Sequence, residues 1–216
     1  MKKIICLMLC LVLICPMLFS CNVQNDVKGN ETDNPNDNET DNIYTTLYDT
    51  SETPTNFVLI RVKDYGDIVV ELYPDTAPIT VENFKNLVSE NFYDGLIFHR
   101  IISGFMIQGG GVTQDYKLKE CPSIKGEFAL NGVQNDLLHT RGVISMARAE
   151  ALDSASSQFF IMHETSPHLD GKYAAFGMVL EGIETVDKIA SVKTDYYNWP
   201  LEDVVIEFIR FIDYNN

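Results

Sequence analysis

Short strand-like runs separated by turn residues are the feature that most limits how this 216-residue chain can fold. The runs FVLIRV and DIVVELY are rich in β-branched and aromatic residues, and a glycine-containing turn, KDYG, separates them. Similar runs follow at 142–147, 158–163, 174–179 and 203–212, with a shorter strand expected near 127–130. So many short strands predict a closed antiparallel barrel or a sandwich, because a parallel sheet needs a helix between successive strands.

Two segments have helical rather than strand spacing. We expect the first helix to begin with Thr80 as its N-cap and Glu82 near the positive end of the helix dipole. We expect the second to begin after Gly182. The apolar residues on the buried sides of the two helices are Val81, Phe84, Leu87, Val88, Ile183, Val186, Ile189 and Ala190. The sequence therefore predicts a mainly β domain with two helices.

Residues 1–20 are typical of a bacterial lipoprotein signal peptide. Lys2 and Lys3 precede an apolar run at 4–19, which is shorter than the roughly 20 residues of a membrane-spanning helix. The run ends in the sequence LFSC, which resembles a lipobox, so we expect cleavage before Cys21 and lipid on its thiol. The alternative is an ordinary secretory signal in which Cys21 has no special role.

Composition divides the remaining chain into a linker and a folded domain. After Cys21, residues up to 56 are dominated by Asn, Asp, Thr and Glu, so we expect residues 21–56 to be a lipid-bearing, disordered tether. The folded domain is expected at 57–213. The formal net charge is -15, from 16 basic and 31 acidic residues, which excludes a nucleic-acid partner because phosphate binding needs a basic face. With Cys121 the sole cysteine in the folded domain, we expect no disulfide.

Strand alternation places a set of chemically useful side chains on one face. The residues expected on that face are Arg100, Met106, Gln108, Gln158 and Phe160. The residues expected in the core behind it are Ile107, Phe159 and Ile161. His99 is expected to be a hydrogen-bonded structural histidine rather than a catalytic base. A shallow apolar pocket edged by amides and one guanidinium is suited to holding a peptide, not to attacking one.

Metal chemistry is not indicated. The run HETSPH has Pro167 where the second histidine of an HExxH zinc motif would stand. The sequence also presents no serine–histidine pair or carboxylate dyad near Arg100. We therefore expect no metal and no cofactor.

Four segments together resemble a known family. The segments FHRIISGFMIQGG, SMARA, SSQFFI and HLDGKYAAFG are similar to the signature segments of cyclophilins, which are peptidyl-prolyl cis–trans isomerases. The likeness runs from about Phe57 to Ile212. It implies a closed eight-stranded antiparallel β-barrel capped by two α-helices, and an enzyme that rotates X–Pro bonds in proline-containing polypeptides.

The resemblance also implies roles for individual residues. The catalytic group is Arg100, assisted by Gln108. The proline pocket falls on Phe105, Met106, Phe160 and Leu169. The contacts to the peptide backbone fall on Gln108, Gln158 and the main chain of Ala147, Arg148 and Ala149.

Four positions depart from the family pattern. His168 stands where a tryptophan is important for cyclosporin, which implies weakened binding of that drug. Tyr173 replaces a frequent histidine at the pocket rim, and Arg148 replaces a common asparagine that binds mainly through its backbone. Ser103 replaces the usual proline of a turn.

Two functions remain open from sequence alone. One is a monomeric isomerase, anchored by lipid to the outer side of a bacterial membrane, that assists the folding of exported proteins. The other is a non-catalytic chaperone or adaptor that binds peptides in the same groove. The presence of Arg100 favours the enzyme, since a donor at the twisting amide stabilises the transition state more than the ground state.

Overall fold

The computed structural model describes residues 50–214, so the predicted signal peptide, Cys21 and most of the predicted linker lie outside the described residues. The strands are β1 (Thr50–Ser51), β2 (Phe57–Val62), β3 (Gly66–Leu72), β4 (Leu96–Ile97), β5 (Arg100–Ile102), β6 (Met106–Gly109), β7 (Val112–Thr113), β8 (Val143–Met146), β9 (Phe159–Met162), β10 (Ala175–Glu181) and β11 (Ile206–Ile212). The helices are α1 (Pro78–Ser89), α2 (Ile183–Ala190) and two 3₁₀ turns, η1 (Ala129–Asn131) and η2 (Pro167–Leu169). Within residues 50–214, no helix combines the length and apolar character that crossing a bilayer requires.

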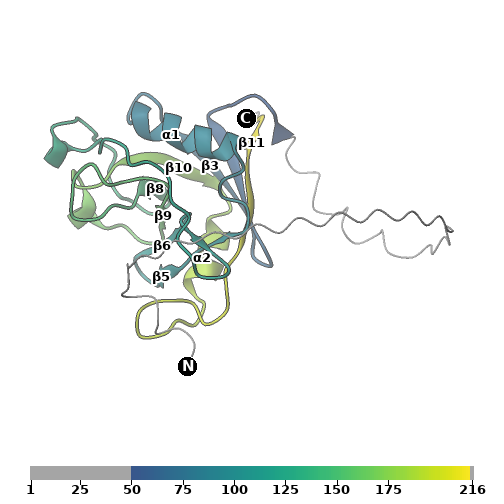
Figure 1. Cartoon of the computed structure of the whole chain (residues 1–216). Coiled ribbons are helices and arrows are strands. Elements are labelled where there is room, and N and C mark those ends of the chain that lie inside the picture. The colour runs from purple at the N-terminus through teal and green to yellow at the C-terminus, as the bar shows by residue number, and fades with distance from the viewer. Residues whose placement is uncertain (1–49, 215–216) are drawn as a thin grey trace, which may run out of the picture. The chain divides into compact units, whose positions relative to one another are not determined.

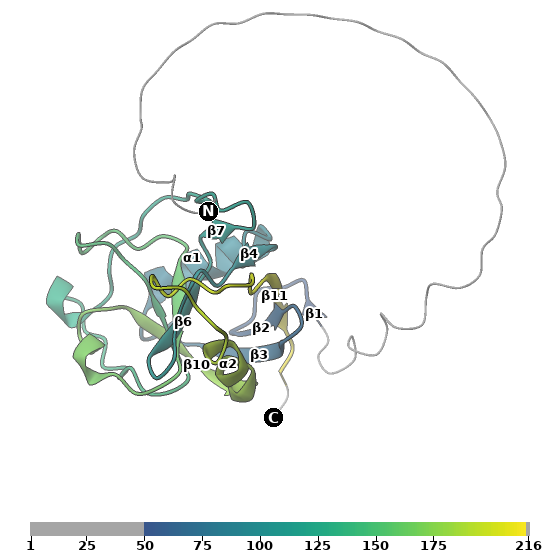
Figure 2. The same cartoon turned by 90° about the horizontal axis from the view of Figure 1, so that it is seen from below.

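Nine strands form one curled antiparallel sheet in the order β1-β11-β2-β3-β10-β8-β9-β6-β5, and β4 pairs with β7 (Figures 1 and 2). The mainly β class with two α-helices is confirmed. The closed eight-stranded barrel is not confirmed, because β5 and β1 each have one sheet neighbour among the described strands, which leaves a half-barrel. A loop occupies the outer edge of β5, where the Ile101 N–H donates to the carbonyl of Asn198 at 2.9 Å.

The first helix begins earlier than predicted. Its N-cap is Ala77 and Pro78 is its first residue, so the prediction of Thr80 as the N-cap is wrong. The carboxylate of Glu127 takes the capping role, accepting hydrogen bonds from the Ile79 N–H at 3.0 Å and from the Thr80 N–H and hydroxyl at 2.7 Å each. A side chain 47 residues distant in sequence therefore satisfies the first turn of α1.

The predicted strand near 127–130 is also wrong. Glu127 is buried against α1 and residues 129–131 form the turn η1. By contrast, the second helix starts directly after Gly182, as predicted. Gly182 has φ of 80°, a left-handed conformation that favours glycine, and so it fixes the entry into α2.

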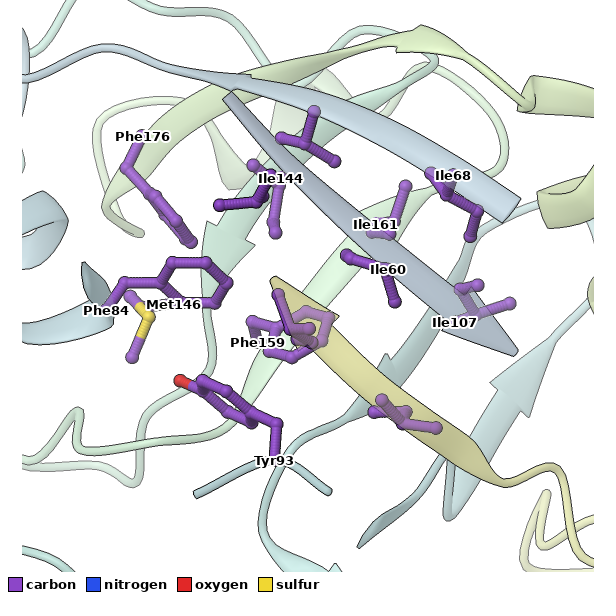
Figure 3. Close-up of a cluster of buried hydrophobic side chains, with 14 of the residues drawn as sticks. Ile60, Ile68, Phe84, Tyr93, Ile107, Ile144, Met146, Phe159, Ile161 and Phe176 are labelled. Atoms are coloured by element: carbon purple, nitrogen blue, oxygen red, sulfur yellow. The ribbon is translucent and has the colours of Figure 1, made fainter. Parts of the chain in front are cut away.

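Aromatic rings from distant parts of the chain form the centre of the core. Phe84 of α1 lies 5.2 Å from Tyr93, 5.8 Å from Phe159 and 5.3 Å from Phe176, measured between ring centroids (Figure 3). The Tyr93 hydroxyl donates to the carbonyl of Ser157 at 3.1 Å, which satisfies the one polar atom of the four rings. Residues of both helices belong to this same cluster, and Figure 1 shows α1 at the top and α2 low in the view, with the sheet between.

Candidate functional site

The register of four neighbouring strands sorts their side chains into two rows. One row, here called the pocket row, pairs across β5, β6, β9 and β8 and consists of Arg100, Gln108, Phe160 and Ser145. The next row, here called the core row, consists of Ile101, Ile107, Ile161 and Ile144. Since successive side chains of a strand point to opposite faces, the two rows face away from each other. The predicted division between pocket and core is confirmed, and Ile107, Phe159 and Ile161 all belong to the core cluster.

The pocket row opens into a cavity of about 440 Å³. Its lining residues are Arg100, Phe105, Met106, Gln108, Ala147, Arg148, Phe160, His168, Leu169, Lys172 and Tyr173. Met106, Phe160 and Leu169 are almost completely buried and make an apolar floor, while the polar and charged side chains stand around it. Of the residues predicted from sequence, all line the cavity except Gln158 and Ala149. Lys172 lines it without having been predicted.

In the described part of the chain, the contacts of Arg100 are loose. Its Nη1 lies 3.5 Å from Oε1 of Gln108 and 4.0 Å from the sulfur of Met106, both at the outer limit for a hydrogen bond. Gln108 is held more firmly, because its Nε2 donates to Oε1 of Gln158 at 3.0 Å. Gln158 does not line the cavity, but its hydrogen bond fixes the orientation of the Gln108 amide. Most of the guanidinium donors of Arg100 remain available to a ligand.

The main chain beside the cavity is partly committed. The Ala147 N–H donates to the Gln158 carbonyl at 2.9 Å, and the Ala149 N–H donates to the Ser154 hydroxyl at 3.0 Å. The N–H and carbonyl of Arg148 make no hydrogen bond to another residue of the 50–214 region. An extended peptide can therefore pair with the backbone at Arg148, whereas the Ala149 N–H is already bonded to Ser154.

The Arg148 side chain lies over aromatic rings at the rim. Its guanidinium carbon is 4.8 Å from the ring centroid of Tyr173 and 5.1 Å from that of Phe128. Its Nε donates to the carbonyl of Lys172 at 3.0 Å, and Nη1 donates to the carbonyls of Ala149 and Glu150 at 2.9 and 3.2 Å. These contacts hold the guanidinium in one place, so that it forms a fixed part of the rim.

A buried histidine supports the floor, and no sequence pattern marked it. His139 stacks on Phe160 with ring centroids 6.0 Å apart. Its Nδ1 lies 3.0 Å from the Asp170 carboxylate and its Nε2 lies 3.0 Å from the Ser145 hydroxyl. Because a carboxylate only accepts, Nδ1 carries the proton and Nε2 accepts from Ser145. Burial lowers the pKa of His139 below its ordinary value, although the neighbouring Asp170 carboxylate acts in the opposite direction. The lowered pKa keeps the ring neutral.

His99 lies next to Arg100 in sequence but does not line the cavity, and its ring has a hydrogen bond with the backbone of Ile97. Its Nδ1 is buried and has no hydrogen-bond partner among residues 50–214. The ring lies 5.8 Å from that of Trp199. Desolvation lowers the pKa of His99 to about 4, so the imidazole is neutral at physiological pH.

The arrangement can bind and twist an amide but cannot break one. It combines an apolar floor, a poorly coordinated guanidinium, an oriented amide and a stretch of unpaired backbone. Within residues 50–214, no three His, Cys, Asp or Glu side chains gather into a metal site. Cys121 is a free thiol that is packed against the core and does not line the cavity.

Comparison with known proteins agrees with this geometry. Residues 57–210 match the family model described as cyclophilin type peptidyl-prolyl cis-trans isomerase/CLD. Peptidyl-prolyl cis-trans isomerase A of Dickeya dadantii is 45% identical over 157 residues, which cover 68% of this chain and 80% of the relative. Peptidyl-prolyl cis-trans isomerase B of Escherichia coli is 42% identical over 159 residues, which cover 68% and 94%.

Solved structures give the same result. A cyclophilin-type isomerase of Cryptosporidium parvum, crystallised in the presence of the dipeptide Ala-Pro, matches with a TM-score of 0.62 and 30% identity. The match covers 74% of this chain and 99% of that protein. The family model and this structure therefore agree on the family to which the described domain is similar.

Proposed function

The chain belongs to the cyclophilin-type family of peptidyl-prolyl cis–trans isomerases and is an enzyme of that class, and from this premise we propose that it acts on exported proteins with Arg100 as its catalytic group. Relatives that share more than 40% of their residues over most of their length have the isomerase name. The proposal adds to that premise a chemical role for each residue of the cavity and a location for the enzyme.

The reaction needs no bond to break. An X–Pro amide resists rotation because its C–N bond has partial double-bond character, with a barrier of ~18–20 kcal/mol. As the bond turns out of plane, the prolyl nitrogen becomes pyramidal and gains a lone pair. A guanidinium that donates to this lone pair stabilises the twisted amide more than either planar form, which is the condition for catalysis.

Arg100 is suited to this role because its guanidinium is always protonated and offers several donors in a fixed plane. Phe105, Met106 and Phe160 hold the proline ring, and Gln108 orients the neighbouring carbonyl. An acceleration of a hundred thousandfold requires a reduction of ~7 kcal/mol in the barrier. One charged donor in an apolar cavity, together with removal of water from the amide, is of the right size to supply it.

One observation carries the proposal: the guanidinium of Arg100 borders an apolar cavity and has no close partner among residues 50–214. In a protease-coupled assay on a short X–Pro peptide, we expect Arg100→Ala to lower kcat/KM by about 100-fold or more. Arg210→Gln is the matched control, because it removes an arginine that is paired with Asp94 at 2.6 Å and does not line the cavity. We expect this control to keep wild-type turnover.

The alternative is a chaperone or adaptor that binds peptides without turning them over. It predicts that wild type and Arg100→Ala accelerate isomerisation equally little, while both still bind the peptide. If wild type and Arg100→Ala accelerated isomerisation equally little, the adaptor hypothesis would replace the enzymatic one.

We further propose that the domain is tethered outside the cytoplasm by lipid on Cys21. The support is the sequence: a short apolar leader, a lipobox-like LFSC, and a polar linker of the kind that stays disordered. A single acyl chain binds membranes only marginally, so lasting attachment needs at least two chains. Replacing Cys21 with Ala should release the protein from the membrane fraction or block its processing, and mass spectrometry of the mature N-terminus should find the lipid. Unchanged fractionation of this variant would contradict the anchor.

Two smaller proposals concern binding. We propose that the enzyme is a monomer. We also propose that it binds cyclosporin weakly, because an imidazole at His168 offers less apolar surface than an indole. The His168 ring lies 5.6 Å from Phe105 at the rim. Light scattering after size exclusion tests the first proposal, and cyclosporin inhibition of wild type against His168→Trp tests the second.

A further inference from the structure

The five arginines of residues 50–214 fall into two groups. Arg61, Arg141 and Arg210 each bind an aspartate at 2.6–2.8 Å. Arg100 and Arg148 form no ion pair with a carboxylate of the described chain, and both line the cavity. In a protein with 31 acidic and 16 basic residues, an arginine without a carboxylate partner is unexpected. The two unpaired guanidiniums therefore mark the cavity as the place where positive charge is left for a ligand.

A third cation completes the set. Lys172 lines the cavity, and its ammonium, which has three donors, makes one hydrogen bond, to the His168 carbonyl at 3.0 Å. No aspartate or glutamate is among the lining residues. The acids nearest in sequence do not neutralise these cations: Asp170 binds His139, and Glu150 offers Arg148 only its main-chain carbonyl.

Arg148 is held in a form suited to carboxylate recognition. Its ring contacts with Tyr173 and Phe128 and its three bonds to carbonyl oxygens engage Nε and Nη1. Both hydrogens of Nη2 lack a hydrogen-bond partner among residues 50–214. A fixed guanidinium with free donors binds a carboxylate at small entropic cost, because little side-chain freedom remains to be lost.

We propose that the cavity selects client segments that carry an aspartate or glutamate within a few residues of the proline, an inference that rests on the isomerase function proposed above. The carboxylate binds Arg148 and Lys172 while the proline ring lies on the apolar floor beside Arg100. A cleft lined by charges of one sign concentrates the electric field within it. The net charge of -15 repels acidic peptides at a distance, so a preference for them can arise only from this local set of cations.

The test uses short X–Pro peptides that differ at one position, where Glu, Gln or Lys is placed in turn on each side of the proline. We measure kcat/KM with the wild-type enzyme in the protease-coupled assay. At low ionic strength we expect Glu to exceed Gln by about three- to fivefold in at least one position, and Lys to fall below Gln. Added salt should reduce the preference, because the interacting charges are partly exposed to solvent.

Two variants and one control connect the preference to the cavity. Arg148→Gln and Lys172→Gln should each bring the Glu/Gln ratio of kcat/KM closer to one. Lys188→Gln removes the same charge from the exposed side of α2, away from the cavity, and should leave the ratio unchanged. The ratio compares two peptides on one enzyme sample, so a lower folded fraction in a variant does not affect it.

The outcomes separate this inference from the function on which it rests. A Glu/Gln ratio of one or less at every position, or a ratio that does not respond to salt, overturns the acidic preference while turnover of the Gln peptides upholds the isomerase function. Absence of turnover with every peptide contradicts the isomerase function itself. Should either cavity variant fail to fold, the salt dependence of the wild-type ratio decides the question.

Discussion

The pocket row and the core row come from the same four strands but differ in polarity and in the elements that cover them. The four isoleucines of the core row are at most 1% exposed, and residues of both α1 and α2 lie in the same cluster. The pocket row contains one large apolar side chain, Phe160, between polar neighbours. The cluster around Phe160 is closed by residues from turns and loops, including Phe105, Leu169 and Tyr173.

The difference shows that strand alternation creates two equivalent faces and that the covering elements assign their roles. A helix covers a sheet face completely, because its apolar side chains interdigitate with those of the strands. Loops cover the other face incompletely and leave the cavity of about 440 Å³. Ligand sites commonly arise in this way, at an apolar surface that the fold leaves open and edges with a few polar groups.

The sharpest test of this contrast compares neighbours on β9. Ile161→Ala should lower the free energy of unfolding by about 3–5 kcal/mol, since it creates a closed cavity in the core row. Phe160→Ala should cost less, about 2 kcal/mol, because the space it vacates joins a cavity that water already reaches. Turnover should show the opposite order, with kcat/KM falling at least about tenfold for Phe160→Ala through loss of the proline floor.

Urea denaturation gives the first quantity and the protease-coupled assay gives the second. Loss of turnover in folded Ile161→Ala, with turnover intact in Phe160→Ala, would show that the two rows do not divide stability from function.

A second prediction concerns a titratable group beside the rows, His99. Its pKa is lowered to about 4 by desolvation, while the unfolded chain has the ordinary value of 6.5. Below pH 6.5 the unfolded state therefore takes up a proton that the folded state does not, so acidification destabilises the fold. Between pH 6.5 and about 4, the free energy of unfolding should fall by about 3 kcal/mol more in wild type than in His99→Leu.

Trp199 provides the measurement, since it is the one tryptophan of the chain and its ring lies 5.8 Å from His99. Denaturation followed by its fluorescence at several pH values gives the two curves. Parallel curves for wild type and His99→Leu would show that His99 is protonated as easily in the folded state as in the unfolded state.

A smaller effect on stability is expected at the N-terminus of α1, which lies on the core side of the sheet. Glu127→Gln should lower the free energy of unfolding by about 2 kcal/mol, because an amide replaces a charged acceptor of three hydrogen bonds at a helix N-terminus. Glu82→Gln on the exposed side of the same helix is the control and should change stability by less than about 0.5 kcal/mol. Both variants should keep wild-type kcat/KM, and equal stability of the two would contradict the capping role.

These residues also show which parts of the molecule were predictable from sequence. The bounds of β2, the start of α2 and the division of β6 and β9 into two faces follow from local patterns of period two or of helical spacing, and the structure agrees with them. Most of the cavity residues could be identified because several signature segments agree in order along the chain. The family resemblance, rather than periodicity, supplied Leu169 and Tyr173.

The remainder depends on contacts between distant segments. Glu127 caps a helix that begins 49 residues earlier, and His139 binds Asp170 across 31 residues. No local pattern marks such pairs, because each residue alone reads as a polar residue in a loop. The open edge of the half-barrel was unpredictable for the same reason: the Asn198 loop that occupies the edge of β5 is nearly a hundred residues away in sequence.

The smallest expected effect tests whether the two rows differ in packing as well as in chemistry. Ile107→Leu keeps the volume of a core side chain but changes its shape, and should cost about 1 kcal/mol of unfolding free energy. Met106→Leu on the pocket side should cost less, because the flexible methionine packs against loops that can adjust. Its kcat/KM should fall about two- to threefold, since the sulfur contact with Arg100 is lost and a branched side chain fits the proline ring less well. A larger stability loss for Met106→Leu than for Ile107→Leu would mean that the cavity wall is packed as tightly as the core, and the polar edge alone would then distinguish the two faces.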